Sequence, residues 1–129
     1  MSMSPRGADA YRRTAVQSSS PLGLVVMLYD GAIRFVLEAR DAIARNDVGG
    51  RTAAVSRALA IVAELQNTLN VKEGGEVAQE LDRLYTYVSG RLLDVTSKAD
   101  DAAAAEVHRL LTTLREGWSQ IAQKPPAAR

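Results

Sequence analysis

The chain has 129 residues, of which 16 are basic and 15 acidic, giving a formal net charge of +1. This length fits a single domain of about 100–150 residues, and the balanced charge argues against a dedicated nucleic-acid-binding protein. Without any cysteine the chain has no disulfide, thiolate zinc site or catalytic thiol, and its single histidine argues against a His-rich metal centre or a histidine-based triad. Hydrophobic residues make up 47% of the chain and aromatic residues only 5%, which favours helices with an aliphatic core.

The two ends differ in composition from the middle. Residues 1–20 are rich in Ser, Gly, Pro and Arg and predict a mobile N-terminal arm, in which Tyr11 and Val16 are the sizeable apolar contacts. Residues 124–129, with two consecutive prolines, predict a disordered tail. The longest apolar run, residues 22–29, is shorter than the roughly 20 residues that a membrane helix needs, and no signal-peptide cleavage site follows it. We therefore expect a cytoplasmic protein without membrane insertion.

Between the ends, apolar residues recur with the helical period and predict four helices. The first covers about residues 21–45, with Ser20 as N-cap and a proline in the first turn, where a missing N–H costs no hydrogen bond. The second covers about residues 50–70. The third covers about residues 76–96 and follows a glycine pair that breaks the chain.

The fourth helix begins after Asp100 or Asp101, either of which can cap it, and reaches about residue 123. Connections of about four to six residues make neighbouring helices antiparallel. No alternating strand pattern is present in the sequence. The sequence therefore predicts an all-α protein, an antiparallel up-down four-helix bundle over residues 21–123.

The first helix carries two apolar stripes, whereas a bundle helix needs one. The stripe assigned to the core consists of Leu22, Val25, Val26, Tyr29, Ile33, Val36 and Leu37. The second stripe consists of Leu24, Leu28, Gly31, Phe35 and Ala42. An exposed apolar stripe marks a partner site, but a wide core wedge can also hide both stripes, and these residues leave both interpretations open.

The second helix turns small side chains away from its apolar core face, namely Ala53, Ser56, Ala60, Ala63 and Asn67. Such side chains form a shallow groove that another helix can approach closely, and Asn67 can hydrogen-bond that helix's backbone. The alternative is that alanine serves only as a good helix former on a solvent face. In the absence of a partner, Tyr11 and Val16 of the arm can cover part of this apolar surface.

No constellation of side chains suggests catalysis, a metal or a cofactor. Glu106 and His108 stand two residues apart, which is not the Glu-x-x-His spacing of carboxylate-bridged metal bundles. One alternative function is histidine phosphotransfer by His108, although the lysine and glycine that commonly follow such a histidine are absent. Another is a self-associating helical scaffold, in which the second stripe closes a homodimer.

Several stretches resemble the flagellar secretion chaperones of the FliS type. They are Tyr11 with Val16, Ser20-Pro21 followed by residues 26–31, residues 65–70, and residues 74–78 leading to 84–87. Trp118 in the last helix also fits, and the matches follow the expected order and spacing from Tyr11 to about Gln123.

The resemblance implies a cytoplasmic, non-enzymatic chaperone. Such a chaperone binds the disordered C-terminal region of flagellin, prevents premature polymerisation and assists delivery to the flagellar type III export apparatus, whose gate is a further partner. The flagellin segment wraps around an antiparallel bundle, and the N-terminal arm, here with Tyr11 and Val16, can cover a site for which flagellin competes. Taken together, stripes and resemblance predict these flagellin-binding residues: Leu24, Leu28, Tyr29, Phe35, Ala53, Ala60, Ala63, Asn67 and Asn70.

Overall fold

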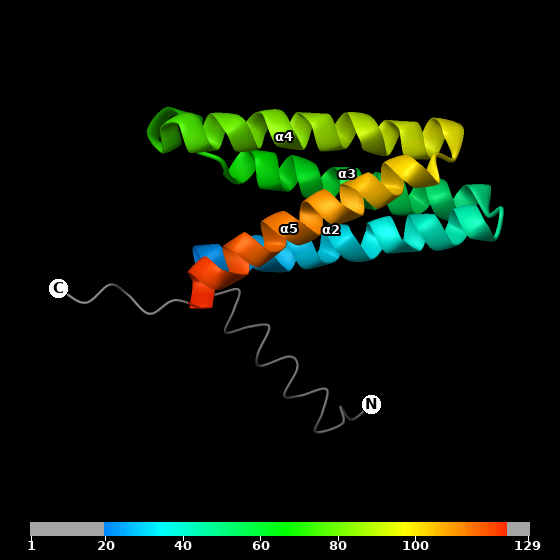
Figure 1. Ribbon diagram of the computed structural model, residues 1–129, viewed down its shortest axis with the longest axis horizontal. Coiled ribbons are helices and arrows are strands. Elements are labelled where there is room, and N and C mark those ends of the chain that lie inside the picture. Colours follow the sequence, from blue (N-terminus) through cyan, green and yellow to red (C-terminus); the bar gives the residue numbers. More distant parts are fainter. Residues whose placement is uncertain (1–19, 124–129) are drawn as a thin grey trace, which may run out of the picture.

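The computed structural model describes residues 20–123, with the backbone alone at 71–73 and 122–123. Its helices are α2 (Pro21–Ala44), α3 (Val48–Thr68), α4 (Val71–Lys98) and α5 (Asp101–Gln123), and the described residues include no strand. Helices α2 and α4 each pack against α3 and α5, so that they occupy opposite corners of an antiparallel bundle (Figure 1). The predicted all-α bundle is confirmed. The predicted arm, with Tyr11 and Val16, and the predicted tail lie outside the described residues.

Side-chain caps fix where α2 and α3 begin. Ser20 has an extended backbone, and its hydroxyl oxygen accepts the backbone N–H of Gly23 at 2.9 Å, as the sequence predicts for an N-cap. Asp47 accepts the N–H of Gly50 in the same way, at 2.9 Å. Helix α3 therefore begins at Val48 rather than at about residue 50, because the aspartate before the glycine pair caps the helix.

A glycine interrupts α4 near its start. The backbone is already helical from Val71, but Gly75 adopts φ 60° and ψ −139°, a left-handed conformation that glycine adopts without steric cost. The predicted break is thus confirmed at Gly75, whereas the helical turn before it was not predicted. At the start of α5, Asp100 Oδ1 accepts the N–H of Ala103 at 3.0 Å, so Asp100 is the cap of the two candidates.

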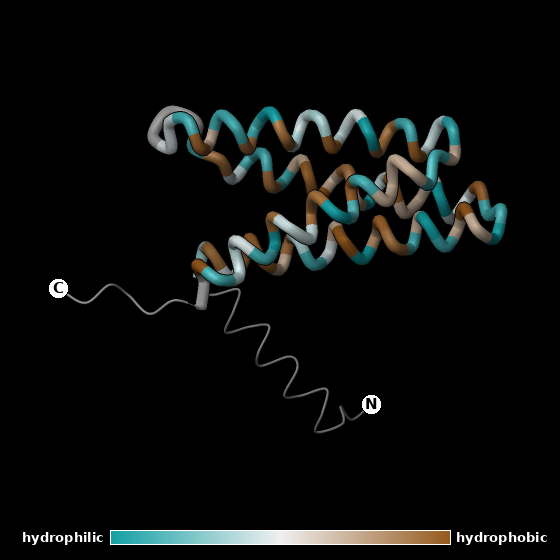
Figure 2. Tube along the Cα trace, viewed as in Figure 1, coloured by the Kyte–Doolittle hydropathy of each residue, from teal (hydrophilic) through white to brown (hydrophobic). Residues whose placement is uncertain are grey.

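The core is aliphatic, as the composition predicts, apart from two tyrosines. Its largest fully buried side chains are Tyr29, Tyr85, Leu65, Leu92, Leu111, Val36, Val55, Val62, Val88, Val95 and Val107. In Figure 2 the hydrophobic positions of α4 lie on the side that faces α3. Full burial of one valine or leucine side chain contributes about 1.5–3 kcal/mol. The bundle therefore rests on apolar burial around one core.

The two stripes of α2 are explained by its two neighbours, α3 and α5. The second stripe is covered only in part: Ala42 is buried, Leu28, Gly31 and Phe35 are half-buried, and Leu24 is 44% exposed. A wide core wedge therefore accounts for Ala42, whereas the rest of the stripe keeps some exposed surface. One assignment to the core is wrong, since Leu37 is 45% exposed on α2. At the start of α4, Val77 is 70% exposed.

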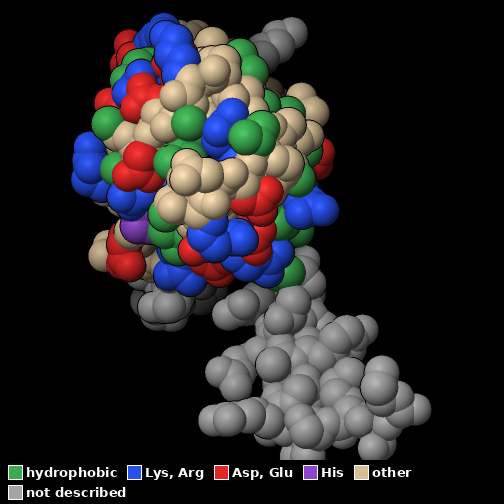
Figure 3. Space-filling model, turned by 90° about the vertical axis from the view of Figure 1, so that its right-hand side faces the viewer, with side chains coloured by type: hydrophobic (Ala, Val, Ile, Leu, Met, Phe, Trp, Pro, Cys, Tyr) green, Lys and Arg blue, Asp and Glu red, His purple; other side chains and the backbone are tan. Residues whose placement is uncertain are grey.

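Charged side chains of both signs cover the end of the bundle where α2 turns into α3 and α4 into α5 (Figure 3). Ion pairs also join α2 to α5 along their length: Arg40 to Asp101 at 2.9 Å and Arg115 to Asp30 at 2.8 Å. Exposed pairs of this kind contribute about 0–1 kcal/mol each, so they favour the antiparallel register more than they stabilise the fold. Within residues 20–123, no helix is both long and apolar enough to cross a membrane.

Candidate partner-binding site

The predicted binding residues on α3 lie on its outer face. Ala60, Ala63 and Asn67 are exposed. Ala53, about two turns before Ala60, is half-buried. On α2, Leu28 and Phe35 are half-buried and pack against the core. The structure thus places these two sets on neighbouring helices whose contact runs through Gly31 and Ile61.

Tyr29 lies in the interior instead of on a binding surface. Its hydroxyl lies 2.5 Å from the hydroxyl of Tyr85 and accepts the indole N–H of Trp118 at 3.3 Å. Burial, and then the hydrogen bond with Tyr85, raise the pKa of Tyr29 above its ordinary value; burial also raises the pKa of Tyr85. Both tyrosines are therefore neutral at physiological pH, and with Trp118 they connect α2, α4 and α5.

The remaining predicted residues, Leu24 and Asn70, line a cleft at the end of the bundle. This end cleft, of about 380 Å³, lies between the start of α2, the end of α3 and the start of α4, and Trp118 of α5 completes its lining. Its other walls are mainly aliphatic, with Tyr85 among them. Leu24 is 44% exposed here, so that an apolar side chain of a partner has an apolar surface to cover.

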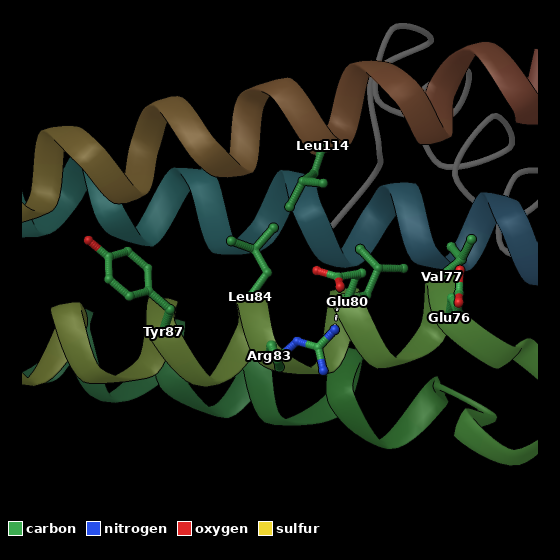
Figure 4. A pocket seen from close by; sticks show the side chains of 8 residues that line it. Glu76, Val77, Glu80, Arg83, Leu84, Tyr87 and Leu114 are labelled. Carbon is green, nitrogen blue, oxygen red and sulfur yellow. Dashed lines mark hydrogen bonds and ion pairs between the residues drawn. The ribbon is translucent and has the colours of Figure 1, made fainter.

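A larger hollow, which the sequence did not predict, lies between α4 and α5. This α4–α5 groove has a volume of about 760 Å³, and its apolar lining is Val77, Leu81, Leu84, Tyr87 and Leu114. Figure 4 shows Leu84 of α4 and Leu114 of α5 pointing into the same space, with the Glu80–Arg83 ion pair at the side.

The α4–α5 groove extends in both directions. Toward the start of α5 it continues into a hollow of about 420 Å³, through the shared residues Leu84 and Leu114. Toward the bundle end it joins the end cleft through the shared residues Val77 and Leu81. Cleft and groove are therefore one continuous apolar surface around the start of α4.

The groove is open because α5 diverges from α4 along its length: it begins beside the end of α4 and ends beside the start of α2 (Figure 1). Where α5 lies beside α4, the two helices are joined by Glu106 of α5. Its carboxylate accepts hydrogen bonds from Arg91 at 2.7 Å and from Tyr87 at 2.8 Å, both on α4. These two donors, Arg91 first, lower the pKa of Glu106 below its usual range. The carboxylate is thus charged at neutral pH, and the contact between the helices persists at this end.

Sequence periodicity cannot separate groove leucines from core leucines, because both occupy the same stripe of a helix. One feature of the sequence does point to the groove. The apolar positions at helical spacing begin at Val77 in α4 and reach Ile121 in α5, and both of these residues are more than half exposed in the structure. His108, on which the phosphotransfer alternative rests, is half-buried on α5 and lines none of the three hollows described above.

Comparison with known proteins gives one consistent result. The model of the family described as flagellar protein FliS matches residues 4–125 of the chain. The flagellar secretion chaperone FliS of Salmonella typhimurium is 38% identical over 92% of this chain and 91% of the relative. The proteins of the same name from Campylobacter jejuni and Bacillus subtilis are 35% identical, over 88% of both chains, and 32% identical, over 88% and 84%.

Proposed function

Since the chain belongs to the FliS family of flagellar secretion chaperones, we propose that it is the chaperone of a flagellin. In this proposal the protein works in the cytoplasm, where it binds the disordered C-terminal region of flagellin and prevents premature polymerisation. It then assists delivery of flagellin to the flagellar type III export apparatus, with the export gate as a further partner. No catalytic step is part of this function.

The observation that carries the proposal is the continuous apolar surface of the end cleft and the α4–α5 groove. A disordered client loses conformational entropy when it becomes ordered, so useful affinity requires a large buried apolar area. The groove residues from Glu76 to Tyr87 cover roughly 17 Å of α4, at about 1.5 Å per residue, which matches about three turns of a docked helix. An amphipathic segment with apolar side chains on one face fits this length.

Binding of this kind explains how polymerisation is prevented. A flagellin segment whose apolar face is buried in the chaperone cannot use that face against another flagellin subunit. The exposed Val77 lies where cleft and groove meet, so that one segment can fill both in a single path. Leu24 adds a second apolar contact at the cleft.

The N-terminal arm gives the free protein a way to cover this surface. Pro21, the first residue of α2, lines the end cleft, and the arm that precedes it carries Tyr11 and Val16. A tyrosine fits a cleft of mainly aliphatic walls with a few polar groups, since its ring is apolar and its hydroxyl is not. We place Tyr11 and Val16 there as an autoinhibitory contact that flagellin displaces.

The test is calorimetric titration with the C-terminal segment of the flagellin encoded in the same genome. Leu24→Asp, in the end cleft, is compared with Leu37→Asp, because both leucines lie on α2 with exposed fractions of 44% and 45%. Saturable binding with a negative heat-capacity change is expected for the wild type and for Leu37→Asp, and weaker binding for Leu24→Asp. Equal loss in both variants would contradict the cleft as the site, and no binding of the wild type at tens of micromolar would contradict the proposed function. Light scattering of the free protein shows whether it forms a homodimer.

A further inference from the structure

Two arginines flank one aromatic ring on the outer surface where α2 meets α3. The guanidinium carbons of Arg34 and Arg57 lie 4.9 Å and 5.8 Å from the centroid of the Phe35 ring. Both arginines are exposed, and Phe35 is half-buried. We call the surface formed by Leu28, Gly31, Phe35, Arg57, Ala60 and Glu64, together with Arg34, the α2–α3 seam.

No described carboxylate compensates these two cations. Neither Arg34 nor Arg57 forms an ion pair within residues 20–123. Asp30, the aspartate one turn before Arg34, instead binds Arg115 at 2.8 Å. Glu38, one turn after Arg34, is exposed and is not paired with either arginine. Two like charges held beside one ring repel each other, and an acidic group from outside the bundle would relieve that repulsion.

The shape of the seam allows a helix to come close. At its middle, Gly31 has no side chain, and Ala60 has only a methyl group. A Cβ at position 31 would lie 3.1 Å from Ile61 Cδ1, so glycine at this position gives the Ile61 side chain of α3 room against α2. Larger side chains, Leu28 and Phe35, stand on either side of Gly31 on α2.

The charges along the seam have a direction. Glu64 lies two turns after Arg57 on α3, roughly 10 Å along the helix. One end of the seam is therefore acidic and the other end is basic. A helix carries partial positive charge at its N-terminus and partial negative charge at its C-terminus. A docked helix is therefore favoured with its C-terminal turn at Arg34 and Arg57 and its N-terminal turn at Glu64. This direction is parallel to α2 and antiparallel to α3.

We propose that the α2–α3 seam binds an amphipathic helix of flagellin whose C-terminal turn carries an acidic group, with that turn on Arg34 and Arg57. This inference rests on the proposed function, because it takes flagellin as the partner. Phe35 provides the apolar contact between the two cations, and a carboxylate on them forms charge-assisted hydrogen bonds. The seam adds a directional contact to the apolar surface of the cleft and groove.

The test compares two double variants that remove the same amount of charge. Arg34→Gln/Arg57→Gln removes the proposed contact, whereas Arg45→Gln/Lys98→Gln removes two exposed cations away from the seam. Affinity for the C-terminal segment of flagellin is measured by calorimetry at low and at moderate salt. The seam variant is expected to bind roughly 3- to 30-fold more weakly at low salt, with a smaller salt dependence, and the control to bind within about twofold of the wild type.

Two further variants separate charge from shape. Arg34→Lys/Arg57→Lys keeps both charges and is expected to recover most of the affinity, and Glu38→Gln is expected to bind more tightly than the wild type. Direction is read from paramagnetic labels at Ser56→Cys and Asn67→Cys, each the only cysteine of its chain. The label at position 56 is expected to broaden the C-terminal turn of the bound helix more strongly. Undiminished binding by the Gln double variant, beside normal wild-type binding, would overturn the seam and leave the proposed function standing; failure of the wild type to bind would overturn both.

Discussion

The hydroxyl groups of Tyr29 on α2 and Tyr85 on α4 lie 2.5 Å apart, and this hydrogen bond joins the two helices at opposite corners of the bundle. Their rings also touch, with centroids 6.4 Å apart and a tilt of 48°. Tyr85 and Trp118 line the end cleft, and Trp118 donates its indole N–H to Tyr29. A hydrogen-bonded group of three aromatic side chains thus supports the wall of the cleft from inside.

Removing the hydroxyl of Tyr29 is expected to destabilise the protein more than removing that of Tyr85. Tyr29→Phe leaves both the Tyr85 hydroxyl and the Trp118 N–H without their partner, at a cost of about 1–3 kcal/mol. Tyr85→Phe leaves Tyr29 still bonded to Trp118, so about 0.5–1.5 kcal/mol is expected. Urea unfolding followed by circular dichroism measures both values. The double variant Tyr29→Phe/Tyr85→Phe should cost less than the sum, and strict additivity would show that the pair is not coupled.

The same pair makes stability depend on alkaline pH. Burial raises the pKa of both tyrosines in the folded state, whereas in the unfolded chain it is about 10. The stabilisation is therefore complete below about pH 10 and is lost as the pH rises toward the folded-state pKa, because only the unfolded state has released its protons. The free energy of unfolding should fall above pH 10 by up to about 1.4 kcal/mol per pH unit for each tyrosine. Urea unfolding at several pH values measures the slope, which should be smaller in Tyr29→Phe/Tyr85→Phe; an unchanged slope would contradict the assignment.

The fold was predictable because its signals are local. Ser20 accepts the N–H of Gly23, and Gly75 takes the left-handed conformation, each where the sequence places a helix start or a break. Leu37 was assigned wrongly to the core, because its place on an apolar stripe is the same whether or not a neighbouring helix covers it. Periodicity gives the direction of a side chain on its own helix and not the distance to the next helix.

The site was less predictable for the same reason. The α4–α5 groove exists because α5 crosses the bundle at an angle. The positions of Leu84 and Leu114 in the sequence do not encode that angle. The tyrosine pair depends on contact between residues 56 positions apart. Leu24 was placed on a partner surface and does line the end cleft, since an apolar residue in the first turn of a helix has few neighbours to cover it.

Two glycines of α4 should respond oppositely to the same substitution. Gly90 is exposed and a Cβ there meets nothing within 4 Å, so Gly90→Ala should stabilise the helix by about 0.5–1 kcal/mol through helix propensity and reduced freedom of the unfolded chain. Gly75 has φ +60°, and Gly75→Ala should destabilise by about 1–2 kcal/mol although space is available. Thermal unfolding of both variants measures the two signs. Stabilisation by Gly75→Ala would mean that α4 straightens in solution.

The arm offers the last test, of competition at the end cleft. If Tyr11 occupies the cleft in the free protein, Tyr11→Ala frees the site and should tighten binding of the flagellin segment several-fold, because binding no longer has to displace the arm. Trp118, the single tryptophan of the chain, lines the cleft, so its fluorescence should shift to longer wavelength in Tyr11→Ala and return when flagellin binds. Thr14→Ala, in the same arm, serves as a control for a substitution that leaves Tyr11 and Val16 in place. Weaker binding in Tyr11→Ala would instead make the arm part of the flagellin site, since a residue that competes with the client cannot also strengthen its binding.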